Sequence, residues 1–324
     1  MDPGYRRLAA RFIRRQAKQL AEQLDGVRLA EDIEFVHRAR VATRRLRAAL
    51  RMFDRTLGRK RTRHWQRAIR RITTALGDAR DRDVQIATLC GALSELHANE
   101  CFPGVARVLV FLERERERFQ RRVMRAIERL ESEGTLRRMR RACRRLCPQS
   151  STPDDLRTQE SLARSSRHIL RQLDNLLGRE DALKNPDDRE GHHAMRIAAK
   201  RLRYALEICR PLYPGGLDEP IEEIKRVQTL LGEIHDCDVW IEQLDAFVLA
   251  ERERTTEMFG HAGPFQHLVP GIEHLRRDRL DRRGQAFDEL VRYWADLGRR
   301  GLWDRLTATV RPPYRPADDP KASA

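Results

Sequence analysis

An internal repeat constrains this sequence more than any other feature. The segment HRARVATRRLR at residues 37–47 recurs as HAMRIAAKRLR at residues 193–203. A second segment, LGxxxDxDV, occurs at residues 76–84 and again at residues 231–239. Two matches in the same order and at nearly the same spacing indicate an internal duplication. We therefore expect two related units, over residues 1–150 and 151–310, followed by a tail over residues 311–324.

The pattern of apolar residues predicts an all-α fold. Nearly every segment repeats its apolar residues at helical spacing, and none alternates as a half-buried strand does. The sequence CPQSSTPDDL at 147–156 interrupts the pattern between the two units, and the proline-rich tail after Val310 is expected to be disordered. Helices are predicted at 5–24, 33–56, 60–76, 81–98, 104–131, 135–146, 156–178, 189–210, 218–231, 236–255 and 270–298. The duplication arranges them as two helical bundles.

The charge of the chain indicates an acidic partner. Its net charge is +16 at pH 7, and only six of its 65 basic residues are lysines. A guanidinium presents a fixed fork of donors that matches phosphate oxygens. The excess positive charge fits nucleic acid, an anionic membrane or a free polyanion.

No feature of the sequence indicates a membrane or an oxidising compartment. No apolar run approaches the ~18–20 residues of a membrane span, and the basic N-terminus has no signal-peptide core. The six cysteines form no CxxC pair and no disulfide framework, which suits reduced thiols. We therefore expect a cytoplasmic protein without a membrane partner, and the sequence does not indicate its oligomeric state.

Each copy of the first motif predicts a basic stripe on one helix face. At about 100° per residue, the cations of the first copy fall within about 80° of His37, and apolar residues take the opposite face. The first stripe consists of His37, Arg40, Arg44, Arg47 and Arg51. The second consists of His193, Arg196, Lys200 and Arg203, with Glu207 at the position that corresponds to Arg51. The helices before the LGxxxDxDV segments add Arg70 and Arg71 in one copy and Lys225 and Arg226 in the other.

Such stripes are unfavourable unless something offsets their repulsion. Like charges at i,i+4 destabilise a helix by about 0.2–0.5 kcal/mol per pair. One interpretation is a bound polyanion that supplies charge and acceptor oxygens along the helix face. The other is a solvated or internally ion-paired face, with Asp81, Asp83, Asp236 and Asp238 as counter-ions. The repetition favours the ligand, because a solvated face has no reason to keep the same spacing twice.

His37 and His193 lie at the start of the two stripes. Neighbouring arginines disfavour the imidazolium, whereas a bound phosphate chain favours it. We therefore expect binding to tighten as the pH falls from about 8 to about 6 through these two groups. The alternative is that each histidine only makes an interhelical hydrogen bond.

The LGxxxDxDV segments predict helix ends. Gly77 and Gly232 suit the position just after a helix, where a left-handed residue ends it. Asp81 and Asp236 are then expected to cap the next helices, because carboxylates accept hydrogen bonds from free amides there. For Asp83 and Asp238, a further role in orienting stripe arginines stays open.

A metal site in these segments is not expected. His235, Asp236 and Asp238 could in principle hold a metal ion, but the first copy has Arg80 where the second has His235. Cys143 and Cys147 have the spacing of one helical turn without a matching pair elsewhere. We expect no metal and no cofactor.

The two motifs together resemble the CHAD family, the conserved histidine α-helical domain. The paired HxxR[VI]xx[RK]RxR helices, each followed by LGxxxDxDV, carry the resemblance over roughly residues 5–305. It implies two helical bundles related by a pseudo-twofold axis around a basic central channel, and inorganic polyphosphate as the partner, because family members bind it and associate with polyphosphate granules. It implies these binding residues: His37, Arg40, Arg44, Arg45, Arg47, His193, Arg196, Lys200, Arg201 and Arg203, with Arg70, Arg71, Lys225 and Arg226 as supplements. By the helical wheel, Arg45 and Arg201 lie off the stripes.

The expected function is therefore non-catalytic binding of polyphosphate, with targeting to granules or their organisation. The alternative is a nucleic-acid-binding protein, although aromatic residues form only 6% of the chain and the stripes hold no stacking aromatic apart from Tyr204. An enzyme that uses a stripe histidine as nucleophile would need an orienting acid and an asymmetric site. The two near-equivalent stripes do not offer these, so we expect no catalysis.

Overall fold

The computed structural model describes residues 2–147, 152 and 154–311, and over these ranges it contains helices and no strand. The predicted all-α class is confirmed. The helices are α1 (Pro3–Leu29), α2 (Ile33–Met52), α3 (Asp54–Leu57), α4 (Arg59–Glu95), α5 (Phe102–Ser132), α6 (Thr135–Leu146), α7 (Gln159–Leu177), α8 (Arg189–Cys209), α9 (Asp218–Phe259), α10 (Val269–Arg299) and α11 (Leu302–Val310). The predicted disordered tail lies, apart from Arg311, outside the described residues.

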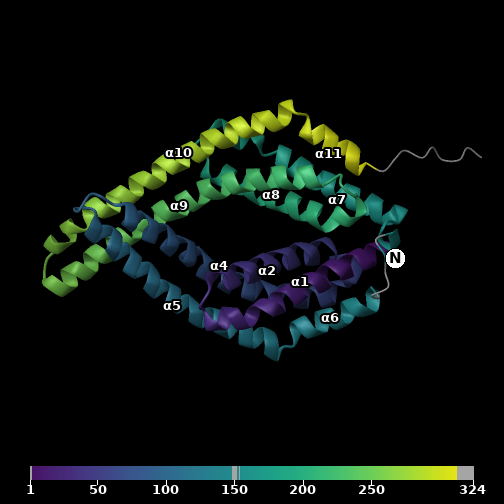
Figure 1. Ribbon diagram of the computed structural model, residues 1–324, viewed down its shortest axis with the longest axis horizontal. Helices are drawn as coiled ribbons and strands as arrows, with labels where there is room; N and C mark the ends of the chain where they lie inside the picture. The colour runs from purple at the N-terminus through teal and green to yellow at the C-terminus, as the bar shows by residue number, and fades with distance from the viewer. Residues whose placement is uncertain (1, 148–151, 153, 312–324) are drawn as a thin grey trace, which may run out of the picture.

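The helices form two layers, with α1 to α6 in one and α7 to α11 in the other (Figure 1). Each layer has its own apolar core. The first contains Leu8, Ile13, Leu46, Phe53 and Ile72 among others. The second contains Leu202, Leu206, Ile224, Leu290 and Leu297 among others. Burial of large aliphatic side chains at helical spacing is what holds such helices together, because each contributes about 1.5–3 kcal/mol.

A third apolar cluster joins the two layers at one end. Leu89, Val105 and Leu112 of α4 and α5 pack against Trp240 and Phe247 of α9 and their neighbours in α10. The joint is close, because a Cβ on Gly104 would collide with the backbone of Leu268, and one on Gly271 with the backbone of Cys101. With the layers fixed at this end, α2 and α8 lie opposite each other in the middle of the molecule (Figure 1).

Aspartates fix where the two stripe helices begin. Asp32 accepts a hydrogen bond from the amide of Glu34 at 2.8 Å at the start of α2. Asp188 accepts one from the amide of Gly191 at 2.9 Å at the start of α8. Such caps are worth about 1 kcal/mol each. Each stripe histidine therefore lies within the first turns of its helix.

The helix ends predicted at the LGxxxDxDV segments are wrong. The ranges 60–76 and 81–98 belong to the single helix α4, and 218–231 and 236–255 belong to the single helix α9. Gly77 and Gly232 are therefore inside helices and have no left-handed backbone. A glycine costs a helix only about 1 kcal/mol, which cannot end a helix that packs against both an outer core and the joint between the layers. Asp81 and Asp236 consequently cap nothing.

The second aspartate of each segment makes a buried ion pair between helices. Asp83 in α4 accepts from Nε of Arg116 in α5 at 2.5 Å, and Asp238 in α9 accepts from Nε of Arg283 in α10 at 2.7 Å. Both carboxylates are buried. These arginines lie outside the stripes, so Asp83 and Asp238 position α5 and α10 and do not orient the stripe cations. Asp238 also pairs with Arg189 at the start of α8, at 3.3 Å.

None of the helices in the described part of the chain is long and apolar enough to cross a membrane.

Candidate anion-binding groove

A cavity of about 400 Å³ lies between the two layers and is lined from both. Helix α2 contributes His37, Arg40 and Arg44, and α8 contributes Arg196 and Lys200. Helix α5 contributes Phe119, and α4 and α9 contribute Asp78, Arg80, Asp81, Arg82, Gln228, His235, Asp236 and Gln243 among others. The two predicted stripes thus converge on one space, which we call the central groove.

Lys200 shows most clearly how close the stripes come. Burial lowers the pKa of its ammonium to about 7, and the charges of Arg44, Arg196, Arg51 and Arg40 add to this effect. Three of these arginines come from α2 and one from α8. An ammonium surrounded by guanidiniums from both layers is unfavourable without an anion. The pKa of Arg196 is likewise lowered by burial, with Arg44 and Arg40 nearby.

Three histidines at the groove have lowered pKa values; His37 and His235 line the groove, whereas His193 lies beside His235 and does not line it. Burial and then Arg80 lower the pKa of His37, and burial, Arg196 and Lys200 lower the pKa of His193. The ring of His235 lies 4.9 Å from that of His193, and burial and Arg196 lower its pKa to about 4. From the sequence, His235 was considered only as a possible metal ligand. Its position in the second LGxxxDxDV segment is the signal that could have identified it as a residue of the groove.

The first aspartate of each segment faces the groove. The carboxylate of Asp81 accepts a hydrogen bond from Nη2 of Arg40 at 3.2 Å. For Arg40, this is the internal ion pair that the sequence offered as the alternative to a bound polyanion. Burial raises the pKa of Asp236, while Arg196 opposes that effect. These carboxylates and Asp78 line the groove together with His37 and His235. They therefore balance part of its positive charge.

The rest of the first stripe continues along α2 away from the histidines. Burial and Arg70 lower the pKa of Arg47, and burial, Arg47 and Arg201 lower that of Arg51. Arg70 and Arg201 are therefore neighbours of the stripe, and Arg201 lines a small cavity together with Arg51. The guanidinium of Arg44 lies 6.0 Å from the centre of the Tyr204 ring.

Five of the predicted residues make ion pairs and do not line the central groove. Glu207, which takes the position corresponding to Arg51, accepts from Nε of Arg45 at 2.8 Å and pairs with Arg203 at 3.3 Å. Arg71 pairs with Glu133 at 2.5 Å, Lys225 pairs with Glu222 at 2.9 Å, and Arg226 pairs with Glu289. The pairs of Arg203 and Lys225 are local to one helix. Those of Arg45, Arg71 and Arg226 could not be predicted from the sequence, because their carboxylate partners lie more than sixty positions away.

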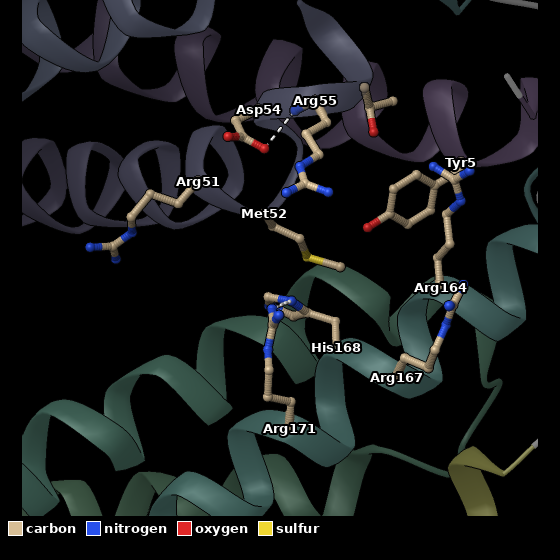
Figure 2. A pocket seen from close by; sticks show the side chains of 10 residues that line it. Tyr5, Arg51, Met52, Asp54, Arg55, Arg164, Arg167, His168 and Arg171 are labelled. Atoms are coloured by element: carbon tan, nitrogen blue, oxygen red, sulfur yellow. Dashed lines mark hydrogen bonds between the residues drawn. The ribbon is translucent and has the colours of Figure 1, made fainter. Parts of the chain in front are cut away.

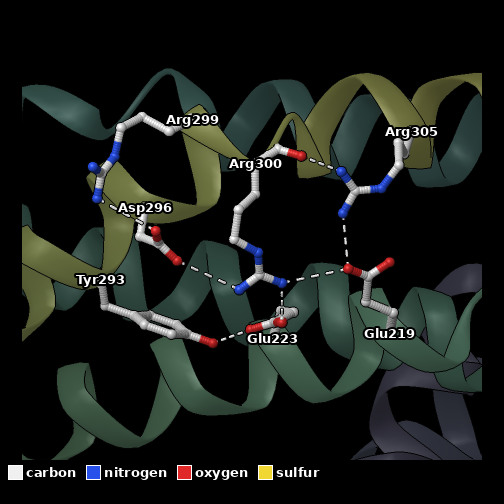
Figure 3. Close-up of polar contacts among 7 residues, drawn as sticks. All are labelled: Glu219, Glu223, Tyr293, Asp296, Arg299, Arg300 and Arg305. Atoms are coloured by element: carbon white, nitrogen blue, oxygen red, sulfur yellow. Dashed lines mark hydrogen bonds and ion pairs between the residues drawn. The ribbon is translucent and has the colours of Figure 1, made fainter.

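Ion-paired arginines outside the groove make a useful contrast. Figure 3 shows Arg300 between Asp296, Glu219 and Glu223, with the last at 2.5 Å, where α10 and α11 meet α9. Over the described ranges, Arg44, Arg47, Arg51 and Arg196 have no such carboxylate partner. Nη1 of Arg80, in the groove lining, is buried and makes no hydrogen bond within the same ranges.

The described residues include no group of three or more histidine, cysteine, aspartate or glutamate side chains placed to hold a metal ion. Asp238 is turned away from the groove by its pair with Arg283.

Comparison with known proteins places these features in a family. The model of the CHAD domain family matches residues 11–245. Among solved structures, the chain is similar to the CHAD domain from the plant Ricinus communis, with 22% identity, a TM-score of 0.62, and coverage of 89% of this chain and 90% of that one. It is also similar to PptA from Streptomyces chartreusis, with 16% identity, a TM-score of 0.53, and coverage of 89% and 98%. At these identities the likeness concerns the fold. No curated protein matches the sequence significantly.

Proposed function

The chain belongs to the CHAD domain family, and from this premise we propose that it binds inorganic polyphosphate, without catalysis, in the groove between its two layers. The observation that carries the proposal is the position of Lys200 among Arg44, Arg196 and Arg40. Cations from both layers crowd one space, and a bound polyanion is what would relieve their repulsion.

The length of the basic surface supports a polymer over a small anion. From His37 to Arg51 the stripe covers fifteen residues of α2, which is roughly 20 Å at the rise of an α-helix. A single phosphate would contact only one or two of the guanidiniums. A linear chain with a charge on every unit can contact the stripe along its whole length, and each charged hydrogen bond is worth about 1.5–3 kcal/mol.

The surroundings of the stripes fit phosphate oxygens without base recognition. Guanidiniums without carboxylate partners offer forked donors to each phosphate group. Single-stranded nucleic acids usually need free aromatic faces on which the bases stack. The aromatic side chains in the groove lining are Phe119 and Trp240, and an arginine already lies over each ring, at 5.6 Å and 5.7 Å from the ring centre. The ring of Tyr204 likewise lies 5.2 Å from the guanidinium of Arg203. Binding at the groove would let the protein attach to polyphosphate granules in the cytoplasm, or organise them.

Competition tests the choice of ligand. A labelled long-chain polyphosphate is bound to the protein at fixed ionic strength, and unlabelled polyphosphate, single-stranded DNA or duplex DNA is added at equal phosphate concentration. Fixed salt matters because counterion release drives both kinds of binding. We expect only unlabelled polyphosphate to displace the label. Displacement by DNA to the same extent would instead indicate a nucleic-acid-binding protein.

A further inference from the structure

A second cavity, of about 500 Å³, lies beyond the C-terminal end of α2 (Figure 2). It is bordered by α1 and α3 on one side and by α7 on the other. Its charged lining consists of Arg51, Arg55, Arg164, Arg167, Arg171 and Asp54. Five guanidiniums against one carboxylate make this cavity strongly basic, and three of the five come from α7, a helix that neither sequence motif includes.

Most of these guanidiniums have no counter-ion. Asp54 accepts from the backbone amide of Arg55 at 2.5 Å, which leaves it oriented toward its own helix. Arg164 is structural, because it pairs with Glu160 at 2.5 Å and lies 5.5 Å from the Tyr5 ring. In the part of the chain that the structure describes, no carboxylate forms an ion pair with the other four arginines.

His168 positions one of the four. Nη2 of Arg171 lies 2.9 Å from Nδ1 of His168. Burial, and then Arg171, lower the pKa of His168 to about 4, so the ring is neutral and Nδ1 can accept the hydrogen bond. The neutral ring of His168 therefore holds the guanidinium of Arg171 in the cavity and adds no charge of its own (Figure 2).

Arg51 links the second cavity to the first stripe, because it is the last residue of that stripe and also lines the cavity. A smaller cavity of about 270 Å³ adjoins it and shares with it Arg51, Met52, His168 and Arg171. That smaller cavity also includes Arg201. Arg51 in turn acts on the pKa of Lys200 in the central groove. Cations therefore follow one another from the groove histidines to α7.

We propose that the second cavity is a phosphate subsite that takes the far part of the same polyphosphate chain that occupies the central groove, so that the protein selects for chain length. The inference rests on the proposed function. A short oligophosphate can fill only one of the two sites. A chain long enough to reach both gains the second site at a high effective concentration, without a second loss of translational freedom.

The test compares two variants that remove the same charge. Arg167→Gln/Arg171→Gln changes two exposed cations of the cavity at i,i+4 spacing. Arg121→Gln/Arg125→Gln changes two exposed cations of α5 at the same spacing, which line none of the three basic cavities. Arg167 and Arg125 also match in donating from Nε to the backbone oxygen four residues before, at 3.4 Å and 3.3 Å.

Calorimetry at fixed salt measures the affinity of each variant for tripolyphosphate and for long-chain polyphosphate. For Arg167→Gln/Arg171→Gln we expect the long chain to bind about tenfold more weakly and tripolyphosphate to bind within about twofold of the parent protein. The control variant should keep both affinities. Equal losses in the two variants, or no loss for the long chain, would overturn the inference.

Three further outcomes distinguish a small-phosphate site from a polymer site, and failure of this inference from failure of the proposed function. If orthophosphate and tripolyphosphate bind at Arg167 and Arg171 with the same affinity change as the long chain, the cavity is an independent small-phosphate site and the inference fails. If Arg44→Gln/Lys200→Gln retains full affinity for every chain length, the central groove is not the binding site and the proposed function itself fails. A loss in the groove variant with none in the α7 variant refutes only the length selection.

Discussion

Lys200 of α8 and Arg44 of α2 share one space although they belong to different halves of the chain, and the arginine is the charge that acts most strongly on the lysine. Burial and this neighbour bring the pKa of Lys200 to about 7. The first repeat has an arginine at the position that the second fills with this lysine. The cation that the second repeat supplies therefore titrates near neutral pH.

Polyphosphate affinity should consequently fall as the pH rises above about 7. Bound phosphates raise the pKa of Lys200, so binding takes up a proton wherever the free lysine is neutral. The full affinity is present below pH 7, and between pH 6 and pH 8 the loss should be roughly tenfold. Titrations with long-chain polyphosphate at fixed ionic strength measure it. Lys200→Arg, which stays charged, should flatten the profile; an unchanged slope would show that another group is responsible.

The histidines should act in a lower pH window than the sequence predicts. The pKa values of His37 and His193 lie below their usual 6.5 in the free protein. A bound phosphate chain raises them, so their contribution grows only as the pH falls below about 6.5. His37→Gln/His193→Gln should therefore weaken binding at pH 5.5 and leave the change between pH 7 and pH 8 intact. If this double variant lost the change in affinity between pH 7 and pH 8, that change would be due to the histidines and not to Lys200.

Asp81→Asn should tighten binding. Asp81 holds the guanidinium of Arg40 at 3.2 Å and adds a negative charge to the groove. Removal of the carboxylate frees Arg40 for phosphate, which we expect to improve affinity about two- to fivefold. The free energy of unfolding should change by less than about 1 kcal/mol, because the pair is largely exposed to water. Weaker binding in a direct titration would mean that Asp81 instead positions Arg40 for the ligand.

Asp83→Asn should instead lower the stability of the fold and leave the affinity for polyphosphate unchanged. Asp83 is buried with Arg116, and its neutralisation leaves the guanidinium without a counter-ion between α4 and α5. Breaking such a pair costs about 3–5 kcal/mol. Urea denaturation should show this loss, while the folded protein keeps its affinity for polyphosphate. Asp238→Asn, which separates Arg283 from its partner, provides the matched case in α9. Stability within about 1 kcal/mol of the parent would contradict the structural role.

The helix faces that carry the basic residues could be predicted from the sequence, because helical periodicity is a local property. On α2 and α8, five residues at this spacing do lie together in the groove, namely His37, Arg40, Arg44, Arg196 and Lys200, whereas His193 and Arg203 do not line it. The continuity of α4 through Gly77 and of α9 through Gly232 could not be predicted in the same way. A glycine lowers local helix stability by a small amount, and the packing of both helices into distant cores outweighs it.

The partners of individual cations depended on tertiary structure. Arg45 meets Glu207 only because α2 and α8 pack against each other, whereas Arg203 meets the same carboxylate within α8. The arginines of α7 follow the same amphipathic pattern as those of many other helices in an arginine-rich chain, so no local signal distinguishes Arg167 and Arg171 from exposed residues such as Arg121. The cavity that they line is formed by residues more than a hundred positions apart.

The central claim is that cations from both halves bind one polyphosphate chain. It is tested most directly by the affinity of Arg44→Gln/Lys200→Gln for long-chain polyphosphate at pH 6.5 and fixed salt, measured beside Arg121→Gln/Arg125→Gln. We predict a loss of at least about tenfold in the groove variant and a change of less than about twofold in the control. Equal affinities in the two variants would contradict the claim, because they would show that net charge, and not the groove, determines binding.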